Sequence, residues 1–111
     1  MTILKGKVAL ITGASRGIGK GIASIFAKYG ADIAFSDIIK DDNTKELEEY
    51  LISFGIKAKA YKSDASNFNE SEKLITEIYN DFGKIDIVVN NAGITRDNLL
   101  LRMSEKDWMM F

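Results

Sequence analysis

Short apolar runs alternate along this chain with longer stretches of helical spacing, and this alternation limits the folds that it can adopt. Residues 8–11, 33–35 and 85–89 are largely apolar runs, whereas residues 57–62 alternate charged with apolar side chains. A continuous apolar run is typical of a strand buried on both faces of a parallel sheet, and an alternating run suits a strand near a sheet edge. The pattern therefore predicts four strands in one sheet.

The three stretches between these runs carry apolar residues at helical spacing, and each ends at a glycine, a frequent helix terminator. Asn43 with Glu46 three residues later resembles a capping box that opens the second predicted helix. The apolar side chains expected on the inner faces are Ile18, Ile22, Ile25, Phe26 and Tyr29 in the first helix, Leu47, Tyr50, Leu51 and Phe54 in the second, and Leu74, Ile75, Ile78, Tyr79 and Phe82 in the third.

Strands that alternate with helices in this order, joined by right-handed crossovers, give a parallel sheet with helices on both faces. The predicted fold class is α/β with a doubly wound parallel sheet. In the strand order 3-2-1-4-5-6 the fourth strand is central, so here residues 85–89 are expected to form an uncovered edge. Residues 104–107 resemble a helix start just before Phe111. We therefore expect residues 1–111 to be the incomplete N-terminal part of a single domain.

The composition excludes several classes of function. The chain has no Cys and no His, so it has no disulfide, no thiolate nucleophile and only oxygen ligands for a metal, and we predict no metal site. Fifteen basic and sixteen acidic residues give a net charge of −1 without a basic stripe, so neither a nucleic acid nor a membrane surface is an expected partner. The N-terminus lacks the apolar stretch of a signal peptide, and the simplest expectation is a cytoplasmic protein.

A glycine-rich loop joins the first predicted strand to the first helix, with glycines at positions 13, 17 and 19. Such a turn lets the backbone approach a ligand closely and points free N–H groups and the positive end of a helix at an anion. The spacing does not match a P-loop, because the gap from Gly13 to Gly19-Lys20 is one residue too long and Gly21 replaces the expected Ser or Thr. The alternative is that these glycines serve only a tight turn and close helix packing.

Asp37, at the end of the second predicted strand, favours the binding interpretation. A carboxylate at this place can accept hydrogen bonds from the ribose of an adenosine. The loop and Asp37 together predict a dinucleotide site.

Three motifs in register resemble the short-chain dehydrogenase/reductase family: Thr12-Gly13-x-x-x-Gly17-x-Gly19, Asp64 after the third strand, and Asn90-Asn91-Ala92-Gly93 after the fourth. The resemblance covers all 111 residues and implies a Rossmann-type fold. Residues 13–19 and 90–100 are more closely similar to one group of this family, the bacterial 3-oxoacyl-[acyl-carrier-protein] reductases.

The resemblance implies a set of cofactor-binding residues: Gly13, Ser15, Arg16, Gly17, Ile18, Gly19, Asp37, Asp64, Asn90, Ala92 and Gly93. By this resemblance, the glycines would hold the pyrophosphate and Ile18 would pack under the cofactor. Asp64 would hydrogen-bond the adenine, and residues 90, 92 and 93 would line the cofactor. Asn91 resembles the asparagine that stabilises the sheet in this family. Alternatively, Asp64 is a turn or cap residue, and residues 90–93 have a purely structural role.

The choice between NADP(H) and NAD(H) stays open. Arg16 can clamp a 2′-phosphate, as in members that prefer NADPH, whereas Asp37 can accept hydrogen bonds from the ribose hydroxyls of NAD and repel that phosphate. Asp37 departs from the pattern of the acyl-carrier-protein reductases, which usually lack an acidic residue there and use NADPH.

The catalytic residues that the resemblance implies, a Ser, an Asn and a Tyr-x-x-x-Lys pair, are expected beyond Phe111. None of the four tyrosines is followed four residues later by Lys, so they are better interpreted as packing residues. The resemblance implies an oxidoreductase that reduces 3-oxoacyl groups carried by acyl carrier protein in fatty-acid synthesis, as a homotetramer when full length. Two alternatives remain: a dehydrogenase of this family for another alcohol or carbonyl, or a non-catalytic dinucleotide-binding module. The isolated chain is expected to be inactive.

Overall fold

The computed structural model describes residues 3–15, 17–91 and 101–102, the last two by their backbone alone. Five strands form one sheet in the order β3-β2-β1-β4-β5. The strands are β1 (Val8–Thr12), β2 (Asp32–Asp37), β3 (Ala58–Lys62), β4 (Ile87–Val89) and β5 (Leu101–Arg102). The first four are parallel, which confirms the predicted strand order and the doubly wound α/β sheet.

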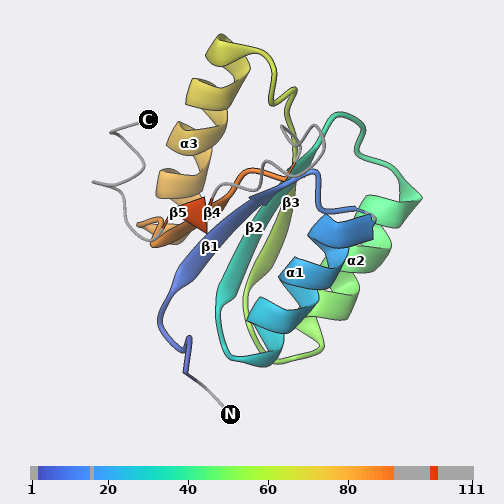
Figure 1. The fold of residues 1–111 in the computed structure, drawn as a ribbon, viewed down its shortest axis with the longest axis vertical. Helices are drawn as coiled ribbons and strands as arrows, with labels where there is room; N and C mark the ends of the chain where they lie inside the picture. The colour runs from blue at the N-terminus through green and yellow to red at the C-terminus, as the bar shows by residue number, and fades with distance from the viewer. Residues whose placement is uncertain (1–2, 16, 92–100, 103–111) are drawn as a thin grey trace.

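The helices cover both faces of this sheet. They are α1 (Gly17–Lys28), α2 (Asp42–Ile52) and α3 (Phe68–Phe82). Figure 1 shows α1 and α2 side by side on one face and α3 on the other. The core is correspondingly divided: Ile33 and Phe35 pack with α1 and α2, whereas Leu10 packs with α3. Among the described residues, no helix is long and apolar enough to cross a membrane.

The prediction of an uncovered edge along the fourth strand is wrong. Strand β5 pairs with β4 in antiparallel register, Leu101 opposite Val89 and Arg102 opposite Val88. Unpaired backbone groups along an apolar edge are unfavourable, and here a later segment of the chain satisfies them. Strand β4 is also shorter than residues 85–89, and Asp86 lies just before it, where its N–H donates to the carbonyl oxygen of Val8 and its Oδ2 accepts the N–H of Val8, both at 2.8 Å.

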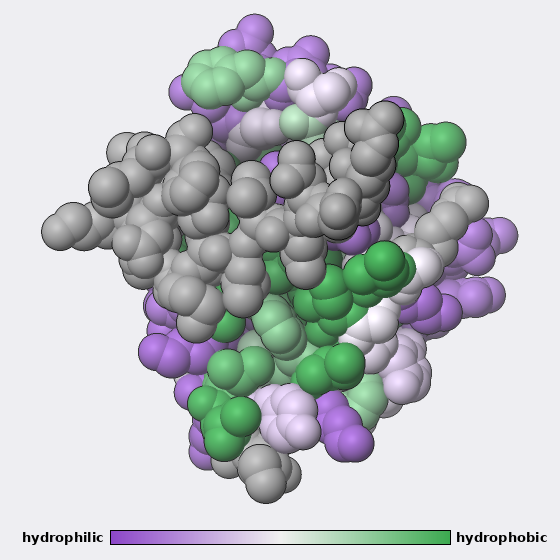
Figure 2. Space-filling view, in the orientation of Figure 1, coloured by the Kyte–Doolittle hydropathy of each residue, from purple (hydrophilic) through white to green (hydrophobic). Residues whose placement is uncertain are grey.

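The inner faces of two helices differ from the prediction. In α1 the fully buried residues are small, Gly19, Ala23 and Ala27. The expected Ile22 and Phe26 pack partly buried against the core, whereas Ile18 and Ile25 are 68% and 55% exposed. The small residues recur every four positions and let the helix approach the sheet closely, which turns the two isoleucines outward. Figure 2 shows apolar side chains at the surface in the lower half of the view, the half that holds α1.

In α2 the buried residues include the expected Leu47 and Leu51. Tyr50, in the same helix, and Phe54, just after it, are 49% and 38% exposed and pack edge to face on each other. In α3 the prediction is confirmed, with Leu74 and Ile78 buried and the three remaining apolar residues partly buried.

The start of α2 also differs from the prediction. Its N-cap is Asp41, whose carboxylate accepts the N–H groups of Asn43 and Thr44, and the side chain of Thr44 closes the capping box. Asn43 and Glu46 do not form the box, because the helix begins two residues earlier than their spacing suggested.

The core on the α3 face gives a test of the packing. Replacing the fully buried Ile78 by Ala removes apolar contacts and leaves a cavity, so the free energy of unfolding should fall by about 2–5 kcal/mol. The exposed Ile25 in α1 is the matched control, and Ile25→Ala should change it by less than about 0.5 kcal/mol. Urea unfolding of the full gene product measures both, and equal losses would contradict the assigned core.

Candidate functional site

The carboxyl ends of four parallel strands meet at one edge of the sheet, and the predicted site residues follow them. Strand β1 lies between β2 and β4, so the connections after β1 and β4 leave the sheet where the strand order reverses. Ligands of open α/β sheets bind in the crevice at this switch point. The glycine loop follows β1, and Asn90 and Asn91 follow β4.

The glycine loop depends on its three glycines for two different reasons. Gly13 and Gly17 have positive φ angles of 63° and 64°, which side chains rarely permit. A Cβ on Gly19 would lie 2.4 Å from the carbonyl oxygen of Gly13 and 2.6 Å from Nδ2 of Asn91. Gly19 is therefore required for the close approach of α1 to the loop.

Hydrogen bonds tie this loop to the residues after β4. Asn91 donates from Nδ2 to the carbonyl oxygen of Gly13 at 2.9 Å. Thr12 donates from its hydroxyl to Oδ1 of Asn90 at 3.1 Å. The two asparagines thus hold the ends of β1 and β4 together, as the structural interpretation of the Asn-Asn motif anticipates.

Asp37 lies directly beside the glycine loop. Its Oδ2 accepts the backbone N–H of Ser15 at 2.9 Å, and the side chain is partly exposed. One carboxylate oxygen therefore orders the loop, at the same edge where the sequence places a ribose.

Thr44 is the residue that the sequence interpretation missed. Its side chain is fully buried, and its Oγ1 lies 3.3 Å from Oγ of Ser15 in the loop. The signal was present, because Asp41 and Thr44 have the spacing of a capping box one turn after Asp37.

Asp64 lies at the same edge, after β3. Ser63, its neighbour, donates its N–H to the carbonyl of Asp37 at 2.9 Å, so the ends of β2 and β3 are adjacent. The hydroxyl and the N–H of Ser66 both donate to Oδ1 of Asp64, and these bonds lower the pKa of that carboxyl. Asp64 thus forms a turn with Ser66 and stays ionised near neutral pH.

The structure brings together the loop glycines, Ser15, Asp37 and Asn90, with Asp64 at the end of the adjacent strand. Ile18 lies exposed at the start of α1. Arg16, Ala92 and Gly93, also predicted to bind the cofactor, lie outside the described residues, as does the helix start predicted at 104–107.

The tyrosines of the described chain behave as packing residues. Tyr61 is buried against the α3 face and donates its hydroxyl to Oδ2 of Asp81 at 2.6 Å. Burial, followed by the bond to Asp81, raises the pKa of Tyr61 well above its usual value. Its phenol is therefore held against α3 by Asp81 and is a weak acid.

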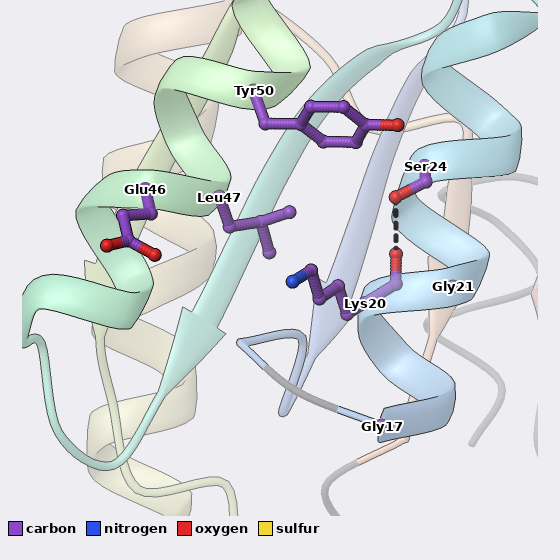
Figure 3. Close-up of a pocket in the computed structure, with 7 residues that line it drawn as sticks. All are labelled: Gly17, Lys20, Gly21, Ser24, Glu46, Leu47 and Tyr50. Atoms are coloured by element: carbon purple, nitrogen blue, oxygen red, sulfur yellow. Dashed lines mark hydrogen bonds between the residues drawn. The ribbon is translucent and has the colours of Figure 1, made fainter.

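A cavity of about 590 Å³ lies between α1 and α2, behind the glycine loop. Figure 3 shows Lys20 and Ser24 from α1 opposite Leu47, Tyr50 and Glu46 from α2. The cavity shares Gly17 with the loop, and its other lining residues come from α1 and α2, with the buried Leu47 among them. Among the described residues, no group of three or more acidic side chains is placed to hold a metal.

The contact at Gly19 yields a direct test. Gly19→Ala should displace the loop and lower the free energy of unfolding by about 1–3 kcal/mol. A Cβ on Gly21, in the same helix, would meet no described atom within 4 Å outside its own helix, so Gly21→Ala should leave stability unchanged or raise it by up to about 1 kcal/mol. Urea unfolding of the two variants side by side decides, and a neutral Gly19→Ala would refute the close contact.

Known proteins share both the sequence pattern and the fold of this chain. A family model described as short chain dehydrogenase matches residues 7–111. The 3-oxoacyl-[acyl-carrier-protein] reductase of Vibrio cholerae is 45% identical over 105 residues, which are 95% of this chain and 41% of that protein.

Solved structures of short-chain dehydrogenases have the same fold as this chain. A short chain dehydrogenase from Burkholderia cenocepacia in complex with NADP superposes with a TM-score of 0.78 at 36% identity, covering 86% of this chain and 39% of that one. An NAD+-bound xylitol dehydrogenase superposes with a TM-score of 0.79 at 32% identity, covering 84% and 35%. The chain thus spans about two fifths of the relatives that it matches. With its glycine loop, its strand order and this match over residues 7–111, the chain belongs to the short-chain dehydrogenase family.

Proposed function

We propose that this chain binds NAD(H) or NADP(H) at the carboxyl edge of its sheet and forms the cofactor-binding part of an oxidoreductase. The observation that carries the proposal is the glycine loop, in which Gly13 and Gly17 have positive φ and Gly19 packs under the carbonyl of Gly13. Such a loop lets a pyrophosphate approach the backbone and the start of α1. Helix α1 has no acidic residue in its first turn, so the positive end of its dipole is not neutralised there.

The remaining candidate residues take complementary roles in this proposal. Asp37 accepts hydrogen bonds from the ribose hydroxyls, and Asp64 receives the adenine at the end of β3. Ile18 packs under the cofactor, and Asn90, Ala92 and Gly93 line it. Arg16 is the candidate clamp for a 2′-phosphate. When bound, the nicotinamide supplies or accepts a hydride, and the residues of this chain hold and orient it.

The substrate proposed for the full gene product is a 3-oxoacyl group on acyl carrier protein, reduced to the 3-hydroxyacyl form. The 45% identity to the reductase of Vibrio cholerae supports this substrate. The catalytic Ser, Tyr and Lys are expected after Phe111, and the assembly is expected to be a homotetramer. Asp37 favours the second candidate, a dehydrogenase for another alcohol or carbonyl, because it departs from the pattern of the NADPH-dependent reductases.

The role of Asp37 is tested by cofactor affinity. Asp37→Ala removes a charged acceptor from the ribose end, so NADH binding should weaken about 10- to 100-fold while NADPH binding is preserved or improved. Asp32, at the opposite end of β2, is a matched control, since it also accepts one backbone N–H, that of Lys57, at 2.9 Å. Fluorescence titration of the full gene product gives both dissociation constants. An unchanged ratio in Asp37→Ala, or an equal shift in Asp32→Ala, would contradict the assigned role.

The location of the catalytic residues is tested by turnover. The full gene product should oxidise NADH or NADPH when a 3-oxoacyl thioester is added, whereas the isolated chain of 111 residues should show no turnover, because it holds no Tyr-x-x-x-Lys pair. Absorbance at the nicotinamide band reports both reactions. Turnover by the isolated chain would refute the proposed division of the site, and a full gene product active only on other carbonyls would select the second candidate.

A further inference from the structure

Strand β3 is the last strand at one end of the sheet, and its outer edge faces no described strand (Figure 1). At its inner edge, the carbonyl of Lys57 accepts an N–H from β2, and the N–H of Ser63 donates to a carbonyl of β2. Successive residues of a strand direct their backbone groups alternately to its two edges. The N–H and carbonyl groups of Ala58, Ala60 and Lys62 therefore point outward.

A carboxylate from α2 occupies the middle of this outer edge. Oε2 of Glu48 accepts the N–H of Ala60 at 2.7 Å. Glu48 is half-buried, and Ala60 is 2% exposed. An uncovered row of N–H and carbonyl groups at a sheet edge is a template for pairing with another chain. Glu48 thus supplies, from the same chain, the acceptor that a neighbouring strand would otherwise bring.

The outer edge of β3 is complementary to itself. When two copies lie antiparallel with Ala60 opposite Ala60, each outward residue faces an outward residue, as a hydrogen-bonded pair requires. Ala58 then faces Lys62, and Lys59 faces Tyr61, so no two like charges are directly opposite. Within one chain the ammonium of Lys59 lies 5.3 Å from the centre of the Tyr61 ring, which is the distance of a cation–π contact. Backbone and side chains therefore both fit a second copy.

We propose that the outer edge of β3 is a pairing surface for a second copy of this chain, and that Glu48 keeps it closed by accepting the N–H of Ala60. A second copy has to place a carbonyl oxygen where Oε2 of Glu48 lies, so the strands pair only when Glu48 leaves. The inference is independent of the proposed function, because none of the residues assigned to the cofactor takes part in it.

Sedimentation velocity of the full gene product, compared with the wild type at the same concentrations, tests the proposal. Glu48→Ala exposes the N–H of Ala60, so copies should add edge to edge and the average mass should rise at least about twofold as the concentration increases. Glu49→Ala removes the same charge from an exposed position of α2 and is the matched control. It should sediment like the wild type.

Two conservative variants separate the hydrogen bond from the charge, and they keep the proposal testable if Glu48→Ala does not fold. Glu48→Gln loses the charge but keeps the length and an acceptor oxygen, so it should sediment like the wild type. Glu48→Asp keeps the charge but is one methylene shorter, so it should fail to reach Ala60 and should associate like Glu48→Ala.

Amide hydrogen exchange locates the contact between the copies. In Glu48→Ala, the N–H groups of Ala58, Ala60 and Lys62 should exchange at least about tenfold more slowly at high concentration than at low concentration. In the wild type, Ala58 and Lys62 should exchange faster than Lys59 and Tyr61, whose N–H groups point to β2.

Four results would overturn the inference. Glu48→Ala that sediments like the wild type would leave Glu48 as a structural link between α2 and β3. Association without slower exchange at the outer edge would place the contact elsewhere. Association of Glu48→Gln but not of Glu48→Asp would assign the effect to charge. Equally slow exchange at both edges of β3 in the wild type would show that another part of the gene product covers this strand.

Discussion

The contact between Gly19 and the loop after β1 sets the distance between the first helix and the sheet, and the candidate site depends on it. No side chain fits there, because a Cβ would meet the carbonyl of Gly13 at 2.4 Å. The rest of α1 follows the same constraint, with Ala23 and Ala27 buried one and two turns later. The close approach brings the first N–H groups of α1 to the edge where four parallel strands end.

A set of polar contacts then holds the surrounding segments to this loop. Asn91 fixes it from the side of β4, Asp37 from the side of β2, and Thr44 from the start of α2. Each contact joins residues far apart in the sequence. Together they fix the shape of the loop at the carboxyl edge of the sheet.

The fold was largely predictable from the sequence because each strand and helix carries its own local signal. Burial of apolar side chains produces a regular pattern in the sequence, and this pattern identified the strands at 8–11 and 33–35 and the inner face of α3, which carries Leu74 and Ile78. The outward turn of Ile18 and Ile25 was not predictable from hydrophobicity, because small residues rather than large ones decide which side of α1 packs closely. The pairing of β5 with β4 was missed since it joins segments without a local signal.

The candidate site was predictable as a set of residues but not as a network. The sequence places the glycine loop, Asp37 and the two asparagines directly after predicted strands, and the structure brings them together. Thr44 escaped notice because the helix start was placed at Asn43, two residues late. With the N-cap placed two residues too late, the sequence did not show that the side chain of Thr44 faces the glycine loop.

Hydrogen–deuterium exchange of the full gene product, with and without saturating NADH or NADPH, tests the central claim most directly. We expect slower exchange on cofactor addition in the segments that follow the parallel strands, residues 13–15, 37–41, 63–66 and 90–91. The backbone amides of the residues that line the cavity between α1 and α2, such as Ser24 and Tyr50, should exchange at an unchanged rate. Protection confined to that cavity, or no protection at the strand ends despite bound cofactor, would contradict the assignment of the dinucleotide to the glycine loop.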